Sequence, residues 1–225
     1  MYWFEEVKES VFDVLFPPRC VACQCPGEWW CEACRRSVQG CPTSIPLTSS
    51  VLDGLVSTGW YHDEKLRTMI TALKYRGATC VLPSLAQHVV DWRESRLGAW
   101  PWAGEQDLAI QYVPASPSRV RSRGFDQAES IAKIIQKELV PWGKMMQQLQ
   151  RCDENRLTQA SLAHGPLRQA NVQNLFFYVP TEKIPECVLL VDDVYTTGST
   201  MQEAARVLKN SGVKRVYGFV LAVGK

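Results

Sequence analysis

The chain has 225 residues, 46% of them hydrophobic, and a formal net charge of +2. This hydrophobic content suffices for a real core and excludes an intrinsically disordered protein. The small net charge excludes a uniformly basic surface, so any contact with nucleic acid would have to be local.

Residues 1–16 predict an amphipathic helix, because their apolar side chains are spaced along one helical face. Acidic residues such as Glu5 and Glu6 stand where an export signal needs positive charge. No apolar stretch approaches the ~20 residues of a membrane span, so we expect a cytoplasmic protein. We expect this helix to pack on the protein's own core, and a position on a membrane surface is the alternative.

Six of the nine cysteines lie between positions 20 and 41, and four of them form two C-x-x-C pairs separated by seven residues. Two such pairs can bring four thiolates onto one structural Zn²⁺. The expected metal ligands are Cys20, Cys23, Cys31 and Cys34. Disulfides are the alternative, which the reducing cytosol disfavours, and an iron–sulfur cluster is another. Cys25 or Cys41 could replace a ligand or remain a free thiol.

A cysteine knuckle of this size cannot build its own core, so the metal would supply its folding energy. Trp29 and Trp30 lie inside it and could stack on bases, although packing is the alternative. The segment 40–50 is rich in Pro, Ser and Thr, and it marks the predicted boundary between a module at 1–50 and a main domain at 51–225.

The main domain alternates between apolar runs and segments of helical periodicity. We expect, in chain order, a strand at 55–61, helices at 62–75 and 82–95, a strand at 108–113, a helix at 126–139, strands at 174–178 and 188–191, a helix at 201–210 and a strand at 213–223. From residue 108 onward this alternation predicts a parallel sheet with helices on both faces and a site at the carboxyl ends of the strands.

The most informative block runs from Val188 to Thr200. An apolar strand ends in Asp192 and Asp193, and a loop rich in hydroxyl groups then leads into a helix. Backbone N–H groups, hydroxyls and the positive end of the helix dipole together suit a phosphate. The two carboxylates suit sugar hydroxyls or a Mg²⁺ held through water. A solvated turn before an N-capped helix is the alternative.

Two groups of cations could face this block. Arg119, Arg121 and Arg123 alternate after a loop expected at 114–118, where they suit a pyrophosphate. A solvated loop or an RNA contact is the alternative. Lys74 and Arg76 suit the carboxyl end of a helix and could also reach a phosphate. The long polar segment 151–172 is expected to be a lid or a binding loop.

Five short motifs occur in a fixed order along the chain. They are Lys74-Tyr-Arg-Gly77, Arg123-Gly-Phe-Asp-Gln127, Thr158-Gln159, Arg168-x-x-Asn171-Val172 and the block from Val188 to Thr200. With the preceding cysteine knuckle, this order resembles the ComF family. Asp126 stands where that family usually has Asn, and Pro-Ala-Ser-Pro after Val113 replaces its usual Pro-x-Pro-Leu-His.

The resemblance implies a type I phosphoribosyltransferase fold, an α/β fold with a mostly parallel sheet and helices on both faces. It also implies a small hood at about 51–107, a core at 108–225, and binding of 5-phosphoribosyl-1-pyrophosphate (PRPP) with Mg²⁺. Asp192 and Asp193 would hold the ribose hydroxyls. The 5-phosphate would contact Thr196, Thr197, Gly198, Ser199 and Thr200.

The same resemblance places pyrophosphate at Ala115 and Ser116, where the superfamily often has a strained cis peptide. Arg119, Arg121 and Arg123 would lie over this leaving group. Arg121, Arg123, Asp192 and Asp193 are the expected catalytic residues, and the segment 151–172 would close over the site.

Three functions follow from the resemblance. The first is a phosphoribosyltransferase with an unidentified acceptor. The second is a competence factor in which PRPP binding supports the handling of single-stranded DNA together with DNA-uptake proteins. The third is a PRPP sensor or zinc-finger scaffold without turnover.

Overall fold

The computed structural model describes residues 17–41, 45, 50–75, 78–95, 100–152, 175–180 and 183–224. The helix expected at 1–16 lies outside these residues, as do Arg76, Gly77 and nearly all of the expected lid at 151–172.

The main sheet has five strands, and every pair of neighbours is parallel. Their spatial order is β1 (Gly54–Trp60), β7 (Arg215–Val223), β6 (Cys187–Tyr195), β2 (Leu108–Tyr112) and β3 (Lys144–Met146). The central strands β6 and β7 are apolar almost throughout because helices cover both faces of the sheet. The parallel sheet predicted from the alternation of elements is confirmed.

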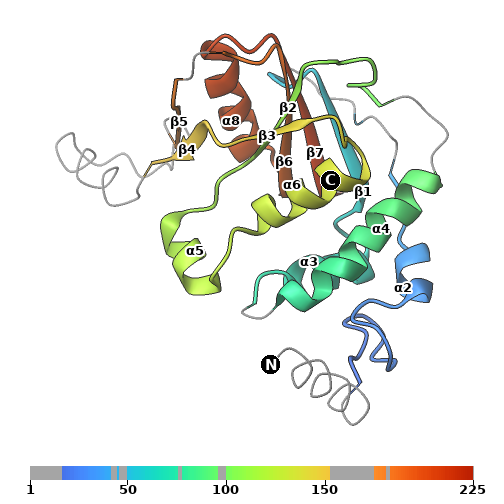
Figure 1. Ribbon diagram of the computed structural model, residues 1–225. Helices are drawn as coiled ribbons and strands as arrows, with labels where there is room; N and C mark the ends of the chain where they lie inside the picture. The colour runs from blue at the N-terminus through green and yellow to red at the C-terminus, as the bar shows by residue number, and fades with distance from the viewer. Residues whose placement is uncertain are drawn as a thin grey trace, which may run out of the picture.

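Helices lie on both faces of this sheet, as Figure 1 shows. One face packs against α3 (Glu64–Ala72), α4 (Leu82–Glu94) and α6 (Gln127–Glu138), and the other packs against α8 (Ser199–Asn210). Successive side chains of β6 alternate between the two layers: Leu189 and Val191 join the first, and Val188 and Leu190 join the second. The fold therefore has three layers with two hydrophobic cores.

Aspartates fix where two of these helices begin. The carboxylate of Asp63 accepts hydrogen bonds from the N–H groups of Lys65 and Leu66 at 3.0 Å and so caps α3. Asp126 caps α6 through the N–H of Ala128. A short 3₁₀ turn, η1 (Ala78–Val81), leads into α4. The sequence placed the main helices and strands within three residues of these bounds, except that β6 continues to Tyr195, four residues beyond the predicted end of the strand at 188–191.

Strand β1 lies at one edge of the main sheet, where it pairs with β7. The segment 51–107, expected to form a hood, therefore contributes a strand to the same sheet as the core segment. The boundary near residue 107 stays a prediction.

A second, two-stranded sheet pairs β4 (Leu149–Arg151) antiparallel to β5 (Phe176–Tyr178). The sequence analysis anticipated neither β3 nor β4, because runs of three residues are too short to show a period. The pairing brings together the two segments that flank residues 153–174. The N–H of Cys152 extends this pairing with a hydrogen bond to the carbonyl of Leu175.

The loop expected at 114–118 ends earlier than predicted, because residues 117–123, with the three arginines, form the helix α5 (Pro117–Arg123). Ser116 is its N-cap, and Pro117 suits the first helical turn because proline there loses no hydrogen bond. Gly124 ends the helix in the left-handed region, with φ of 87°. The helix has no buried side chain, so no apolar periodicity indicated it.

Across the part of the chain that the structure describes, no helix combines the length and apolar character needed to cross a membrane.

Candidate functional site

A cavity of about 400 Å³ opens at the carboxyl ends of β2 and β6. Its walls come from the chain after β6, the chain after β2, and the facing parts of α5 and α6. It brings together Ala115, Arg119, Arg123, Asp192, Asp193, Thr196, Thr197, Gly198, Ser199 and Thr200, all of which the sequence analysis had selected. Ser116 and Arg121 do not line it.

The acidic pair, Asp192 and Asp193, lies near the carboxyl end of β6. The Asp192 carboxylate accepts a hydrogen bond from the N–H of Asp193 at 2.8 Å. Asp193 in turn accepts a hydrogen bond from the Gln127 side chain, and its carboxylate lies 3.9 Å from the Lys74 ammonium. Burial, and then the neighbouring charge of Asp193, raise the pKa of Asp192 well above its ordinary value. Two adjacent carboxylates in this setting favour a ligand that brings hydroxyl donors or a cation.

The loop after β6 leads directly into α8. The N-cap of α8 is Gly198, which has no side chain to cap the helix and has φ of 76°. Hydroxyl groups surround this turn, with the Thr197 and Ser199 oxygens 3.1 Å apart. Because glycine leaves the first turn of a twelve-residue helix uncapped, N–H groups and hydroxyls face the cavity together. This arrangement suits a phosphate.

Tyr195 supports the loop from below. The side of Gly198 that would carry a Cβ faces the Tyr195 ring and is filled by it. The Tyr195 hydroxyl lies 3.1 Å from the Gln202 side-chain nitrogen on α8, and Gln202 also accepts a hydrogen bond from the N–H of Val51. The strand end, the loop and the helix are therefore held as one unit.

The helix α5 orients its arginines differently. Arg119 and Arg123 are four residues apart, so they share one helical face and both line the cavity. Arg121 stands two residues from each and points elsewhere. Arg123 donates to the Gln127 side-chain oxygen at 2.7 Å, and Gln127 donates to Asp193. A chain of hydrogen bonds thus connects the cationic helix with the acidic pair.

Asp126 ties the chain after β2 to α6. Its carboxylate accepts from the N–H of Ala115 at 2.9 Å and from that of Ala128 at 3.0 Å, and burial raises its pKa. Ser116 is buried because its hydroxyl caps α5. The cis peptide expected at Ala115–Ser116 is not found: every peptide bond among the described residues is trans.

Gln127, Arg151 and Tyr195 also line the cavity, and the sequence gave none of them an individual role. Gln127 was visible within the Arg-Gly-Phe-Asp-Gln motif, next to the acid that begins α6. Arg151 is the first residue of the segment expected to be a lid or a binding loop, whereas Tyr195 gave no comparable signal. Lys74, one of the two cations considered for a phosphate, does line the cavity, whereas Arg76 lies outside the described residues.

The cysteine knuckle forms a separate candidate metal site. The sulfur atoms of Cys20, Cys23, Cys31 and Cys34 all lie within 4.8 Å of one another. The Cys23 and Cys31 sulfurs are 3.6 Å apart, close to the roughly 3.8 Å between thiolates around a tetrahedral Zn²⁺. Cys25 and Cys41 are outside this group, and the Cys41 thiol donates to the carbonyl of Ser57 at 3.1 Å. The matched C-x-x-C pairs therefore provide a donor set that fits a structural metal.

The thiols in this group differ in acidity. Burial opposes ionisation of Cys20, but hydrogen bonds from the backbone N–H groups of Cys31, Cys23 and Ala22 lower its pKa to about 6. Burial and the neighbouring cysteines raise the pKa of Cys34. Since a cation stabilises several thiolates at once, metal binding would release the protons that these interactions retain.

The knuckle packs on the main domain through Trp30, which is fully buried and lies 4.8 Å from the His88 ring on α4. Arg35, on the short helix α2 (Glu32–Arg36), donates to Asp91 of α4 and to the carbonyl of Trp30. Packing, one of the two interpretations of this tryptophan pair, is therefore confirmed for Trp30. Only Trp29, which is 39% exposed, remains accessible.

The parallel sheet, the acidic strand end and the hydroxyl-rich turn into α8 define a protein of the phosphoribosyltransferase fold class. In agreement, residues 159–224 match the family model described as phosphoribosyl transferase domain. The chain is 30% identical over 109 residues to Competence protein ComFC of Streptococcus pneumoniae, covering 48% of this chain and 45% of that protein. It is 32% identical over 118 residues to Competence protein F of Haemophilus influenzae, covering 51% and 49%.

This chain therefore spans about half the length of the curated relatives it matches. Together with the domain match and the cysteine knuckle, these similarities support a ComF-family protein.

Proposed function

We propose that the cavity at the ends of β2 and β6 binds PRPP together with Mg²⁺. Asp192 and Asp193 would hold the ribose hydroxyls, with Mg²⁺ bound between the carboxylates and the substrate oxygens as this ion prefers. The 5-phosphate would lie in the turn at 196–200, on the amino end of α8. Arg119, Arg123 and Lys74, which line the same cavity, would neutralise the pyrophosphate.

The observation that carries this proposal is the juxtaposition of opposite charges within one cavity. Three carboxylates, an uncapped helix end and four cations line it together; the cations are Lys74, Arg119, Arg123 and Arg151. PRPP has this composition, with a diol beside a monophosphate and a pyrophosphate.

Arg121 is withdrawn from the pyrophosphate set because it does not line the cavity. Lys74 takes its place in the proposal. The role of Ser116 becomes structural, since its hydroxyl caps α5 and its side chain is buried. The assignments of Arg119, Arg123, Asp192, Asp193 and residues 196–200 are retained.

If the protein is an enzyme, a nitrogen nucleophile would attack C1 of the ribose while the C1–O bond to pyrophosphate breaks with its electron pair. The arginines and Mg²⁺ would stabilise the departing charge. The names of the two relatives favour a role in competence, so we propose that PRPP binding supports the handling of single-stranded DNA with DNA-uptake proteins.

One contact favours the alternative, a PRPP sensor or zinc-finger scaffold without turnover. The N–H of Ala115 already donates to Asp126, so it is not free to bind a pyrophosphate oxygen in this arrangement. The assay that separates the two is release of pyrophosphate from PRPP, with and without candidate acceptor bases. Release that requires an acceptor supports the transferase, and tight binding without release supports the sensor.

The proposed location is the cytoplasm, where the thiols of the knuckle would remain reduced and able to bind Zn²⁺. None of the nine cysteines forms a disulfide in the structure, which is compatible with such a compartment.

The decisive experiment is calorimetric titration of PRPP and Mg²⁺ into the wild type and into the Asp192→Asn/Asp193→Asn variant. We expect micromolar affinity, about −8 kcal/mol, for the wild type and its loss in the variant. A change in this affinity when single-stranded DNA is added would support the competence role. Absence of binding by the wild type would contradict the PRPP proposal.

A further inference from the structure

Asp126 is the third carboxylate of the cavity at the ends of β2 and β6, and none of the contacts proposed for PRPP involves it. Its side chain lies between two backbone donors. The Oδ2 atom accepts from the N–H of Ala115 at 2.9 Å, and the Oδ1 atom accepts from the N–H of Ala128 at 3.0 Å. Asp126 and Ala115 both line the cavity, so this carboxylate faces the space proposed for the ligand.

The two helices that begin at this cavity differ at their amino ends. The N-cap of α8 is Gly198, which leaves that helix end without a side-chain cap. The N-cap of α6 is Asp126, whose carboxylate supplies the cap. Because the amino end of a helix attracts anions, the protein's own carboxylate occupies at α6 the place that α8 leaves for a ligand.

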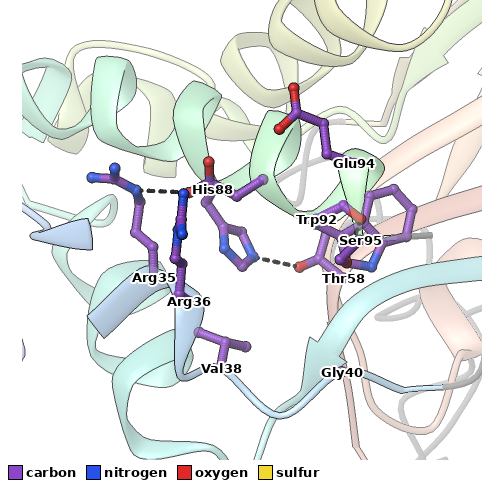
Figure 2. Close-up of a pocket in the computed structure, with 10 residues that line it drawn as sticks. Arg35, Arg36, Val38, Gly40, Thr58, His88, Trp92, Glu94 and Ser95 are labelled. Atoms are coloured by element: carbon purple, nitrogen blue, oxygen red, sulfur yellow. Dashed lines mark hydrogen bonds and ion pairs between the residues drawn. The ribbon is translucent and has the colours of Figure 1, made fainter. Parts of the chain in front are cut away.

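A second cavity, of about 500 Å³, shows a different arrangement of charge. It lies between the cysteine knuckle and α4, beside Thr58 and His88 (Figure 2). Two arginines and two acids line it, and the Arg35 guanidinium lies 3.2 Å from the Asp91 carboxylate. An acid and a base therefore neutralise each other directly in that cavity.

Asp126 is not balanced in this way. Within the part of the chain that the structure describes, its carboxylate forms hydrogen bonds to backbone N–H groups and no ion pair. The nearby cations have other partners, since the Lys74 ammonium lies 3.9 Å from Asp193 and Arg123 donates to Gln127. The charge of Asp126 therefore remains to act on a ligand in the cavity.

A pyrophosphate group beside Asp126 would meet two unfavourable interactions. Its oxygens cannot accept from the N–H of Ala115 while the carboxylate holds that donor. Its negative charge would also lie near a carboxylate that no cation neutralises. The 5-phosphate, proposed to lie in the turn at 196–200, has donors of its own on α8.

We propose that Asp126 is a specificity-determining residue of this cavity. Its carboxylate competes with the pyrophosphate group of PRPP for the N–H of Ala115 and lowers the affinity for that group relative to the ribose 5-phosphate part. The inference rests on the proposed function and deepens it. It implies a cavity that holds the sugar phosphate firmly and the pyrophosphate weakly, so that pyrophosphate leaves easily.

Asp126→Asn is the test, because asparagine is an equally good N-cap whose single amide oxygen can still accept from Ala128. The change removes the charge and frees the N–H of Ala115. Calorimetry with Mg²⁺ compares PRPP with ribose 5-phosphate, which lacks only the pyrophosphate group. In the variant we expect PRPP to bind roughly tenfold more tightly or better, and the affinity for ribose 5-phosphate to change by less than about twofold.

Asp63→Asn is the matched control. Asp63 caps α3 through the N–H groups of Lys65 and Leu66, and it does not line the cavity. This variant removes the same charge from the same kind of helix end, and its PRPP affinity should stay within about twofold of the wild type because distant charges are screened. A similar gain in both variants would indicate an effect of net charge alone and would overturn the proposal.

An unchanged PRPP affinity in Asp126→Asn, or an equal gain for ribose 5-phosphate, would also overturn it. Loss of a helix cap alone does not tighten binding, so a gain separates the proposed role from a structural one. Should Asp126→Asn fail to fold, Asp126→Ser also removes the charge and keeps a good N-cap residue.

The wild-type titration tests the PRPP site separately. Binding by the wild type without a gain in Asp126→Asn rejects the role of Asp126 and leaves the PRPP site standing. Binding by the variant alone supports the role of Asp126 and contradicts PRPP binding by the wild type. Absence of binding by both proteins rejects both proposals.

Discussion

Two separate constraints require glycine at position 198. Its backbone is left-handed, with φ of 76°, and the space that a Cβ would need is filled by the Tyr195 ring. Tyr195 cannot move away freely, because its hydroxyl is hydrogen-bonded to Gln202. The turn that we propose for the 5-phosphate is therefore fixed by a single residue and its support.

We expect Gly198→Ala to destabilise the protein by more than the cost of the backbone angle alone. Gly104→Ala is the matched control, since Gly104 has φ of 96° and nothing within 4 Å of the added Cβ. The control should lose about 1–2 kcal/mol, and Gly198→Ala should lose a further 1–3 kcal/mol from overpacking. Urea denaturation measures the unfolding free energy of both variants. Equal losses would show that the Tyr195 ring moves aside without an energetic penalty.

On the scale of elements, the helix α5 places its three alternating arginines on two different faces. Arginines at alternate positions look equivalent in an extended loop, but a helix separates Arg121 from Arg119 and Arg123. The cap at Ser116 and the glycine at position 124 therefore determine which arginines reach the cavity.

Truncation of these arginines should reveal this orientation. Arg123→Ala should weaken PRPP binding by roughly tenfold to a hundredfold, since hydrogen bonds to charged groups contribute about 1.5–3 kcal/mol. Arg121→Ala removes the same charge from the other face and should change the affinity by less than about threefold. Calorimetry with Mg²⁺ compares the two, and similar losses from both variants would contradict the assignment.

The helix α4 contains an acid-sensitive group. Burial of His88 lowers its pKa to about 4, so the ring is neutral in the folded protein at pH values where it would be protonated in the unfolded chain. The neutral form of His88 therefore contributes its full share of stability at pH values above the pKa of histidine in the unfolded chain, which is near 6.5. This contribution, at most about 3 kcal/mol, is lost as the pH falls from 6.5 toward 4.

His88→Gln should abolish this part of the pH dependence. We expect the unfolding free energy of the wild type to fall more steeply than that of the variant between pH 6.5 and pH 4. Both proteins keep the same cysteines, so their difference isolates His88 from acid effects at the knuckle. Parallel curves for the two proteins would mean that His88 is protonated without penalty.

On the scale of the whole molecule, the knuckle is part of the main core. Cys20, Cys34 and Trp30 belong to the same hydrophobic cluster as α3, α4 and α6. Loss of a metal from the four cysteines would therefore loosen the layer on one face of the sheet, and not only the knuckle.

We expect Cys31→Ser to remove bound Zn²⁺ and to lower the melting temperature by several degrees or more. Cys25→Ser is the control, because Cys25 is exposed and outside the group of four. It should retain one Zn²⁺ per chain and the melting temperature of the wild type. Metal analysis and thermal unfolding provide the readouts, and a full metal content in Cys31→Ser would reject the predicted ligand set.

The sequence predicted what depends on local order along the chain. Three features are recognisable from residues that lie within about a dozen positions of one another. They are the strand before Asp192, the helix after Gly198 and the two C-x-x-C pairs. What it missed depends on distant packing or on very short elements. The solvent-facing helix α5 has no apolar stripe, and β3 and β4 have only three residues each. The cavity beside His88 arises only when the knuckle packs on α4.

The place of β1 at the sheet edge has a kinetic consequence. Among the strands that the structure describes, β1 pairs with β7 alone, and Asp53 accepts a hydrogen bond from Val216 across 163 positions of sequence. Contacts of such long range are slow to form because a large loop must close before they stabilise anything. The edge that carries Thr58, and with it the docking surface of the knuckle, should therefore assemble late in folding.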